Sequence, residues 1–349
     1  MNGGDAAPAR HDRLRAGSIQ SLLDDAGFGA ATFTTLAADA SFRRYARVTG
    51  GPRPALLMDA PPEKEDVRPW LAVARHLRRL GFSAPEVFAA DEDAGLLLIE
   101  DFGDDTFTRL LAQGGAEAAL YDLAVDLLAA LHEIGRADAV PGWLPPYDDD
   151  RLLGEAALFT DWYMPAALGA PTPPELRVEF LGLWREALPP ARALPETLVL
   201  RDYHVGNLML LPDRHGIAAC GLLDFQDAVA GACAYDVVSL IKDARRDLGP
   251  GIAARAEARY LERFPGLDRA GFAAAAAVLA AGRAAKIIGI FTRLWKRDGK
   301  PDYLTHIPRV WHLLEADLGH PALAPLRDWF AKAVPPAKRA VPGLGGSGR

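Results

Sequence analysis

The chain has 349 residues, of which 50% are hydrophobic, and its formal net charge at pH 7 is −7. Because one domain typically holds ~100–200 residues, this length favours two domains. The acidic balance argues against nucleic acid or an anionic membrane as the main partner, since both attract basic surfaces. We therefore expect no nucleic-acid partner and no membrane partner.

The cysteines and the two ends of the chain indicate a cytoplasmic protein. Cys220 and Cys233 are the only cysteines, and their apolar neighbours predict buried free thiols in a reducing compartment. No apolar run approaches the ~20 residues that cross a bilayer, and the first residues lack the apolar core of a signal peptide. Residues 1–15 and 335–349 are expected to be disordered.

Residues 16–104 are expected to form a small lobe with an antiparallel sheet. Apolar residues on both sides of a Gly50-Gly51-Pro52 turn predict a hairpin. Apolar residues between positions 67 and 77 recur at helical spacing, and Gly81 follows as a stop signal. The predicted strands are Arg44–Val48, Ala55–Met58, Val87–Ala90 and Leu96–Ile99.

Residues 105–334 are expected to form a larger helical lobe, joined to the first by the polar segment Glu100–Asp104. A long apolar stripe between residues 120 and 134 ends at Gly135, as expected for a buried helix. The other predicted elements are one strand pair, Asn207–Leu211 and Ile217–Leu223, and helices at Glu175–Leu188, Tyr235–Leu248, Ala253–Phe264, Phe272–Trp295 and Ile307–Leu318.

Three polar residues are expected at one end of this strand pair. Asp202 and Asn207 stand on a polar loop before the first strand, and Asp224 follows the second strand. In an antiparallel hairpin the residue that enters the first strand lies near the residue that leaves the second. Asn207 and Asp224 are therefore expected to be neighbours, with Asp202 arriving at the same end.

These side chains suit phosphoryl transfer. Carboxylate and amide oxygens are ligands that Mg²⁺ takes, and the ion neutralises charge on nucleotide phosphates. We therefore expect Asn207 and Asp224 to bind Mg²⁺. Asp202 is expected to accept the proton of the attacking hydroxyl group.

The same residues resemble the catalytic pattern of the aminoglycoside phosphotransferase and choline kinase superfamily, H-x-D-x-x-x-x-N followed by D-F. Leu200 stands where that pattern has His. The resemblance implies an α+β, two-lobed, protein-kinase-like fold with a small antiparallel-sheet N-lobe and a larger helical C-lobe. It also implies ATP and Mg²⁺ as cofactors, linker residues Glu100, Asp101 and Phe102 beside the adenine, and Asp236 as a brace for the catalytic loop.

The expected nucleotide site departs from that of other kinases at one strand position. Met58 stands where kinases carry a Lys that pairs with the α- and β-phosphates. Guanidinium groups bind phosphate oxygens well, so Arg43 and Arg44, or Arg47 beyond them, are expected to supply this charge. Residues Ala37–Phe42 would cover the phosphates with small side chains and backbone N–H groups.

Two further segments, Asp39–Tyr45 and Met58–Glu63, are similar to the anomeric sugar kinases that phosphorylate N-acetylmuramate and N-acetylglucosamine in cell-wall recycling. The resemblance implies a kinase for the anomeric hydroxyl of an amino sugar, its small-molecule partner. Aminoglycoside, choline and homoserine kinases are alternatives with the same chemistry, and a nucleotide-binding pseudokinase is an alternative of another class. The sequence favours no particular oligomeric state.

Substrate contacts are expected close to the catalytic motif. The lactyl carboxylate of N-acetylmuramate would favour a cation in this region. The candidate substrate residues are His204, Asp227, Arg245 and Arg246. Other cations that could pair with the carboxylate are Lys242, Lys286 and Arg293.

Overall fold

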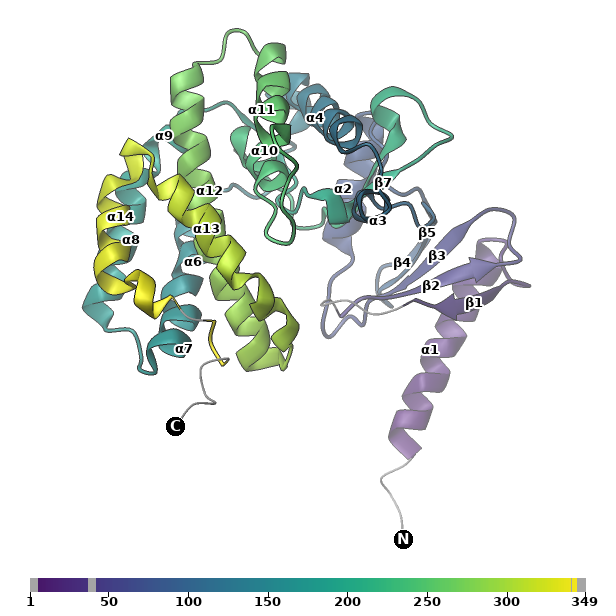
Figure 1. Ribbon diagram of the computed structural model, residues 1–349. Helices are drawn as coiled ribbons and strands as arrows, with labels where there is room; N and C mark the ends of the chain where they lie inside the picture. The colour runs from purple at the N-terminus through teal and green to yellow at the C-terminus, as the bar shows by residue number, and fades with distance from the viewer. Residues whose placement is uncertain (1–5, 37–41, 340, 344–349) are drawn as a thin grey trace. The chain divides into compact units, whose positions relative to one another are not determined.

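The chain folds into two units, and each is built from two stretches of sequence. The first unit holds residues 1–115 and 205–227, and the second holds residues 116–204 and 228–349. The computed structural model describes residues 6–36, 42–339 and 341–343 (Figure 1). Of the segment Ala37–Phe42, which the sequence predicted to cover the phosphates, residues 37–41 lie outside the described residues.

The first unit contains one antiparallel sheet with the strand order β1-β2-β3-β5-β4 (Figure 1). Its strands are β1 (Thr32–Thr35), β2 (Arg44–Thr49), β3 (Ala55–Asp59), β4 (Val87–Asp91) and β5 (Leu96–Glu100). The four strands predicted between residues 44 and 99 are confirmed. The additional strand β1 is exposed along its whole length, so it lacks the apolar alternation that identifies a half-buried strand.

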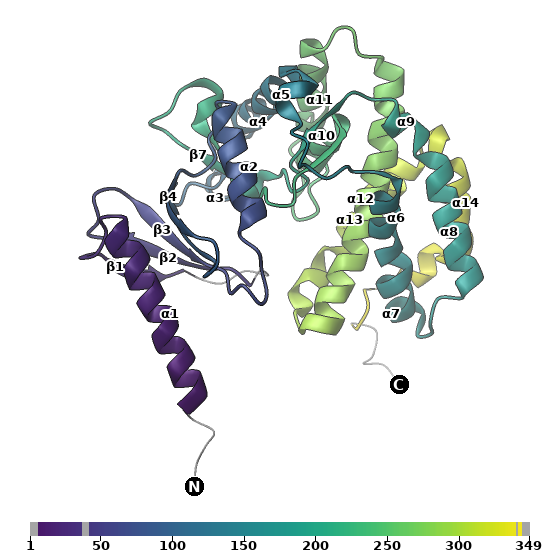
Figure 2. The same ribbon diagram turned by 180° about the vertical axis from the view of Figure 1, so that it is seen from behind.

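Helix α1 (Ala6–Asp25) packs against β4 and β5 of this sheet (Figure 2). Its residues Leu22 and Leu23 belong to the same buried cluster as Val48 and Leu57. Because α1 begins at Ala6, part of the segment 1–15 that was predicted to be disordered is helical. Residues 1–5, 340 and 344–349 lie outside the described residues.

Two helices and two 3-10 turns complete the described part of the first unit around the predicted hairpin. Helix α2 (Arg68–Arg79) starts with a proline in its first turn and buries Trp70 and Leu77, as predicted. The hairpin pairs β7 with β8 and is shorter than predicted, because residues Gly216–Ala219 form a 3-10 turn, η3, instead of strand. The elements are α3 (Phe107–Ala112), η2 (Val205–Asn207), β7 (Leu208–Leu210) and β8 (Cys220–Leu222).

The second unit is largely helical. One strand pair that the sequence did not predict, β6 with β9, runs antiparallel beside the helices. Its elements are α4 (Glu117–Glu133), α5 (Arg136–Ala139), α6 (Asp149–Leu158), η1 (Phe159–Tyr163), α7 (Met164–Leu168), α8 (Pro174–Ala187), α9 (Pro189–Arg192), β6 (Glu196–Val199), β9 (Val229–Ala232), α10 (Ala234–Ile241), α11 (Ile252–Arg263), α12 (Arg269–Asp298), η4 (Pro301–His306), α13 (Ile307–Leu318), η5 (Pro321–Leu323), α14 (Ala324–Ala333) and η6 (Pro336–Lys338).

Helix α12 organises the core of the second unit. It packs against α6, α10 and α13, and α8 lies beside α14 in both views (Figures 1 and 2). By length and composition α12 is apolar enough to cross a membrane, but 67% of its most apolar window is buried inside the protein. It is therefore a core helix, and its apolar residues, among them Val278, Ala281 and Ile288, pack against other helices.

Helix α10 is shorter than the sequence predicted. It ends at Ile241 rather than at Leu248, and Lys242 already has non-helical backbone angles. The Oδ1 atom of Asp243 accepts a hydrogen bond from the backbone N–H of Arg245, a local bond that competes with the helical pattern. Arg245 and Arg246 therefore stand on an irregular segment instead of a helix.

Candidate active site

Asn207 and Asp224 lie together at one end of the β7–β8 hairpin. The Nδ2 atom of Asn207 is 3.4 Å from Oδ2 of Asp224, and the backbone N–H of Leu223 donates to the carbonyl of Asn207. Asp224 has a φ of 57°, a left-handed conformation that costs a non-glycine residue ~1–3 kcal/mol. Strain of this kind is common where a side chain must be aimed at a ligand.

Arg43, the residue before β2, reaches this carboxylate. Its Nη2 atom is 3.3 Å from Oδ1 of Asp224, and its other nitrogens bind Oε1 of Gln226 at 2.7 Å and Oε2 of Glu65 at 2.9 Å. Burial opposes the charge of Arg43, but Tyr45 and these acids outweigh it and raise the pKa of the guanidinium. Arg43 therefore keeps its positive charge and lies beside Asp224, the predicted metal ligand.

The neighbouring Arg44 points to the other side of the sheet. Successive side chains of a strand alternate between its two faces, so Arg44 shares a face with Ala46 and Val48, while Arg43 shares one with Tyr45 and Arg47. Arg44 is exposed. The structure thus separates two arginines that the sequence treated as a pair.

The donors at the hairpin end fit a magnesium ion chemically. Asn207 and Asp224 offer a carbonyl oxygen and a carboxylate, which are hard oxygen ligands. Among the described residues, no group of three or more His, Cys, Asp or Glu residues could hold a metal. Two protein ligands are enough for Mg²⁺, because this ion usually takes its other ligands from phosphate groups and water. The metal role of both residues stays a prediction.

The linker residues predicted to lie beside adenine use their side chains within the first unit. Glu100 pairs with Arg214, and the Oδ2 atom of Asp101 is 2.6 Å from Nε of Arg47. The Phe102 ring lies against Gly221, where an added Cβ would come within 2.9 Å of it. Any nucleotide contact from this segment is therefore expected from its backbone or from the Phe102 ring, not from the two carboxylates.

In the second unit, the backbone before Asp202 is held by Asp236. The buried carboxylate of Asp236 accepts hydrogen bonds from the N–H groups of Leu200 at 2.6 Å and Arg201 at 2.9 Å. Burial raises the pKa of Asp236 to about 7, although these two N–H groups pull it downward. Asp236 thus has the bracing position that the resemblance implied. The structure does not test the base role of Asp202.

His204 is a neutral side chain in the same unit. Burial lowers its pKa to about 4, with opposing effects from Asp243, which raises it, and from Arg245 and Arg283, which lower it. At neutral pH His204 can therefore donate or accept a hydrogen bond, but it carries no charge to pair with an anion. Asp227, the acid among the candidate substrate residues, belongs to the first unit, where it is exposed next to Gln226.

The candidate cations for a substrate carboxylate differ in their partners. Arg246 binds Glu117 at 2.7 Å, whereas exposed Arg245 lies 5.9 Å above the Tyr303 ring and forms no ion pair among the described residues. The other cations with a carboxylate partner are Lys242, which binds Asp317, and Lys286, which binds Glu155. Arg245 is therefore better placed than Arg246 to meet an external anion.

Within each unit, sequence reasoning missed residues that bind predicted site residues or their neighbours. Gln226 binds Arg43, Arg214 binds the linker acid Glu100, and Glu155 binds Arg201. Gln226 stands two residues after Asp224, and this position in the sequence could have identified it as a candidate. No sequence pattern connects the other two to their partners, because each pair is formed by residues far apart in the chain.

Comparisons with known proteins show the family to which the chain belongs. Residues 32–277 match the phosphotransferase enzyme family. The N-acetylmuramate/N-acetylglucosamine kinase of Caulobacter vibrioides is 37% identical, over 92% of this chain and 97% of its own length. The kinase of the same name from Pseudomonas aeruginosa is 38% identical, over 84% of this chain and 86% of its own.

A solved structure shows the same fold at low sequence identity. Choline kinase from Streptococcus pneumoniae matches 89% of this chain and 100% of its own length with a TM-score of 0.59 and 11% identity. The predicted order of an N-terminal antiparallel sheet and a largely helical region, typical of the kinase-like fold, is thereby confirmed. The chain therefore belongs to the phosphotransferase enzyme family.

Proposed function

We propose that this protein is an ATP-dependent sugar kinase that phosphorylates the anomeric hydroxyl of N-acetylmuramate, N-acetylglucosamine or both. The observation that carries the proposal is the likeness to kinases of that name, at 37% and 38% identity over 92% and 84% of the chain. The reaction would belong to cytoplasmic recycling of the cell wall. The sugar is the partner of this enzyme, and ATP is the phosphoryl donor.

In the proposed chemistry, Asp202 is the proton acceptor. The anomeric oxygen attacks the γ-phosphorus of ATP, the bond from that phosphorus to the bridging oxygen breaks, and ADP leaves. The hydroxyl proton passes to the carboxylate of Asp202. An anomeric hydroxyl is more acidic than an ordinary alcohol, so a weak base such as a carboxylate suits it.

Side chains of the first unit would neutralise the negative charge of the phosphates. Asn207 and Asp224 would hold Mg²⁺, which supplies charge neutralisation when it is bound. Arg43 adds a fixed guanidinium next to Asp224, at 3.3 Å, and so supports the proposed replacement of the missing strand lysine. Its bonds to Gln226 and Glu65 hold this charge in place.

The test is a phosphorylation assay with a panel of acceptors. The purified protein is incubated with ATP, Mg²⁺ and either N-acetylmuramate, N-acetylglucosamine, kanamycin or choline, and products are followed by ³¹P NMR. We expect a sugar 1-phosphate signal that the 1-O-methyl glycoside of the same sugar cannot give. Phosphorylation of kanamycin or choline alone, or of the 1-O-methyl glycoside, would overturn the proposal.

A further inference from the structure

The residue before Asp202 adopts a strained backbone. Arg201 has a φ of 68°, and the N–H of Asp202 donates to the carbonyl of Leu200 at 2.9 Å. A hydrogen bond across three residues with a positive central φ is the rare, strained form of the γ-turn. Such a turn persists only where the surrounding structure holds it, and it fixes the direction in which the next residue leaves.

The backbone of this turn is held from one side by α10. Asp236 accepts from the N–H groups of Leu200 and Arg201, and the Oγ atom of Ser239 donates to the carbonyl of Arg201 at 3.2 Å. Asp236 and Ser239 are both fully buried. These bonds fix the peptide groups of the turn but leave the side chain of Arg201 to be held by another element.

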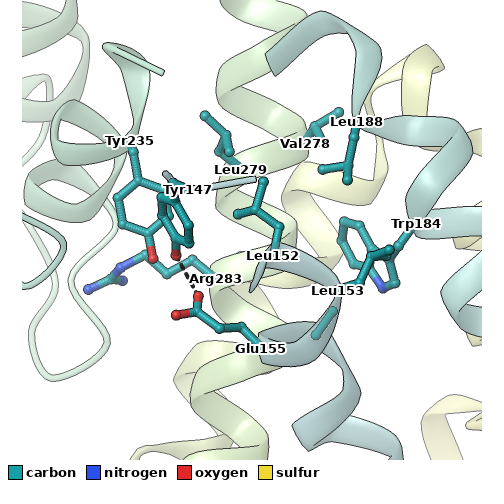
Figure 3. A pocket seen from close by; sticks show the side chains of 12 residues that line it. Tyr147, Leu152, Leu153, Glu155, Trp184, Leu188, Tyr235, Val278, Leu279 and Arg283 are labelled. Carbon is teal, nitrogen blue, oxygen red and sulfur yellow. Dashed lines mark hydrogen bonds between the residues drawn. The ribbon is translucent and has the colours of Figure 1, made fainter. Parts of the chain in front are cut away.

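Glu155, on α6, holds that side chain. Its Oε1 atom receives the Arg201 guanidinium and, at 2.9 Å, the ammonium of Lys286 from α12. Its Oε2 atom accepts from the hydroxyl of Tyr147, as Figure 3 shows. The guanidinium carbon of Arg201 also lies 5.6 Å from the centre of the Tyr147 ring.

Glu155 and the two cations that it binds, Arg201 and Lys286, form an anchor for the turn. The carboxyl group of this anchor is ionised, and all three side chains are largely shielded from water. The Glu155 side chain is 14% exposed, and those of Arg201 and Lys286 are 15% and 10% exposed. Burial alone would raise the pKa of Glu155, but Lys286 and Arg201 lower it below its ordinary value. Screening by solvent is weak at such sites, so one carboxylate can hold both cations firmly.

Glu155 is not placed to contact a sugar. The cavity beside it, lined also by Tyr235, Arg283 and Trp184, has a volume of about 20 Å³ (Figure 3). That volume holds about one water molecule, whereas pockets for small ligands measure ~300–1,000 Å³. A role for Glu155 in the reaction must therefore pass through the residues it binds.

We infer that Glu155 is a positioning residue for Asp202, acting through the side chain of Arg201. The carboxylate ties the strained turn to α6 and α12, and thereby sets the angle at which Asp202 meets the acceptor hydroxyl. This inference rests on the proposed function in that Asp202 is the proton acceptor. A misplacement of a catalytic group by about 1 Å can cost ~10²-fold in rate, so the anchor is expected to affect kcat strongly.

The test compares steady-state kinetics of four single variants and one double variant with those of the wild type, using whichever acceptor the wild type phosphorylates. We expect Glu155→Gln to lower kcat ~10- to 100-fold with the KM for ATP and acceptor changed less than ~2-fold. Glu155→Asp keeps the charge and should recover part of kcat. Asp126→Asn is the control, because it removes a charge that pairs with Arg259 at 2.7 Å between α4 and α11, an ion pair that shares no residue with the turn. It should keep the wild-type kcat.

Arg201→Gly is the decisive variant. Glycine adopts a φ of 68° freely, so this change keeps the turn while it removes the side chain that Glu155 holds. We expect it to lose kcat as Glu155→Gln does, with a fall in the thermal unfolding midpoint no larger than that of Glu155→Gln, because Glu155 keeps Lys286 as a partner. The double variant, Glu155→Gln with Arg201→Gly, should lose no more kcat than either single variant, since both changes break the same contact.

Several results would overturn the inference. These are a wild-type kcat in Arg201→Gly or Glu155→Gln, additive losses in the double variant, or a raised KM with unchanged kcat. If Glu155→Gln fails to fold, the Arg201→Gly result decides alone. A wild type that phosphorylates a different alcohol would refute the proposed substrate, yet the ratio of variant to wild-type kcat with that alcohol would still test the anchor.

Discussion

Arg43 and Asp224 form an ion pair in which Nη2 of the arginine lies 3.3 Å from Oδ1 of the aspartate, although the residues are 181 positions apart. The Arg43 side chain is 11% exposed, whereas that of Asp224 is 44% exposed. The guanidinium is therefore the more deeply held partner, and the carboxylate keeps an accessible side. A metal bound to Asp224 would have a fixed positive charge next to it.

The first prediction separates Arg43 from Arg44. Replacing Arg43 by Ala should raise the KM for ATP ~10-fold or more, because a charge-assisted hydrogen bond is worth ~1.5–3 kcal/mol. Arg44→Ala is the matched control and should change this KM less than ~2-fold, because Arg44 is exposed on the opposite face of β2. Initial rates at varied ATP measure both constants. Equal effects of the two changes would contradict the placement of Arg43.

The second prediction concerns the proton acceptor. Asp202→Asn keeps the size of the side chain but removes its basicity, so kcat should fall ~10²- to 10⁴-fold, the usual contribution of a general base. Asp213→Asn, at an exposed acid near the β7–β8 turn, is the control. Circular dichroism should show both variants folded. A near-wild-type kcat in Asp202→Asn would mean that another group takes the proton.

The third prediction concerns the linker. Glu100 and Asp101 already pair with Arg214 and Arg47, so Glu100→Gln and Asp101→Asn should leave the KM for ATP within ~2-fold. Gly221→Ala should instead raise this KM, because the new methyl group would press on the Phe102 ring from 2.9 Å. Equilibrium binding of ATP can be measured by calorimetry. Loss of binding in both acid variants would show that the carboxylates themselves contact the nucleotide.

The sequence predicted the site best where the contacts are local. Asn207 and Asp224 are joined by one short hairpin, so strand pairing alone makes them neighbours. The contact between Arg43 and Asp224 depends on the register of β2, which decides the face on which each arginine stands. Patterns within the sequence could not distinguish Arg43 from Arg44, because they are two arginines next to each other in the chain.

The Glu155 anchor was beyond sequence reasoning for a different reason. Helix α6, which carries Glu155, was not predicted, since it is short, has a glycine in its middle, and packs against α12 and α8, which lie further along the chain. Tertiary contacts rather than local periodicity thus decide this element. In α10 the error was opposite: an apolar pattern suggested a helix to Leu248, but the Asp243 side chain bonds the backbone locally beyond Ile241.

The fourth prediction follows from the neutral state of His204. Its pKa is lowered by burial from 6.5 to about 4, so between these values the unfolded chain binds a proton that the folded chain does not. The free energy of unfolding should therefore fall by on the order of 2–3 kcal/mol as the pH drops from ~6.5 to ~4. This contribution is present above pH ~6.5 and lost below.

Urea unfolding at pH 7 and pH 5 checks this dependence. His204→Asn should lose less stability between the two pH values than the wild type, because it has no group to protonate. The control His312→Asn changes an exposed histidine and should keep the wild-type difference. Identical differences in wild type and His204→Asn would show that His204 is not held neutral by burial.

The last prediction concerns the choice between the two proposed sugars. N-acetylmuramate carries a lactyl carboxylate that N-acetylglucosamine lacks, and Arg245 is an exposed guanidinium without an ion pair among the described residues. Arg245→Ala should therefore raise the KM for N-acetylmuramate ~10-fold and leave that for N-acetylglucosamine within ~2-fold. Arg246→Ala is the matched control, because Arg246 already binds Glu117 at 2.7 Å. Parallel measurements with both sugars separate recognition of the carboxylate from a general loss of activity. A similar rise in KM for both sugars, or a selective rise in Arg246→Ala instead, would assign the carboxylate contact to another cation.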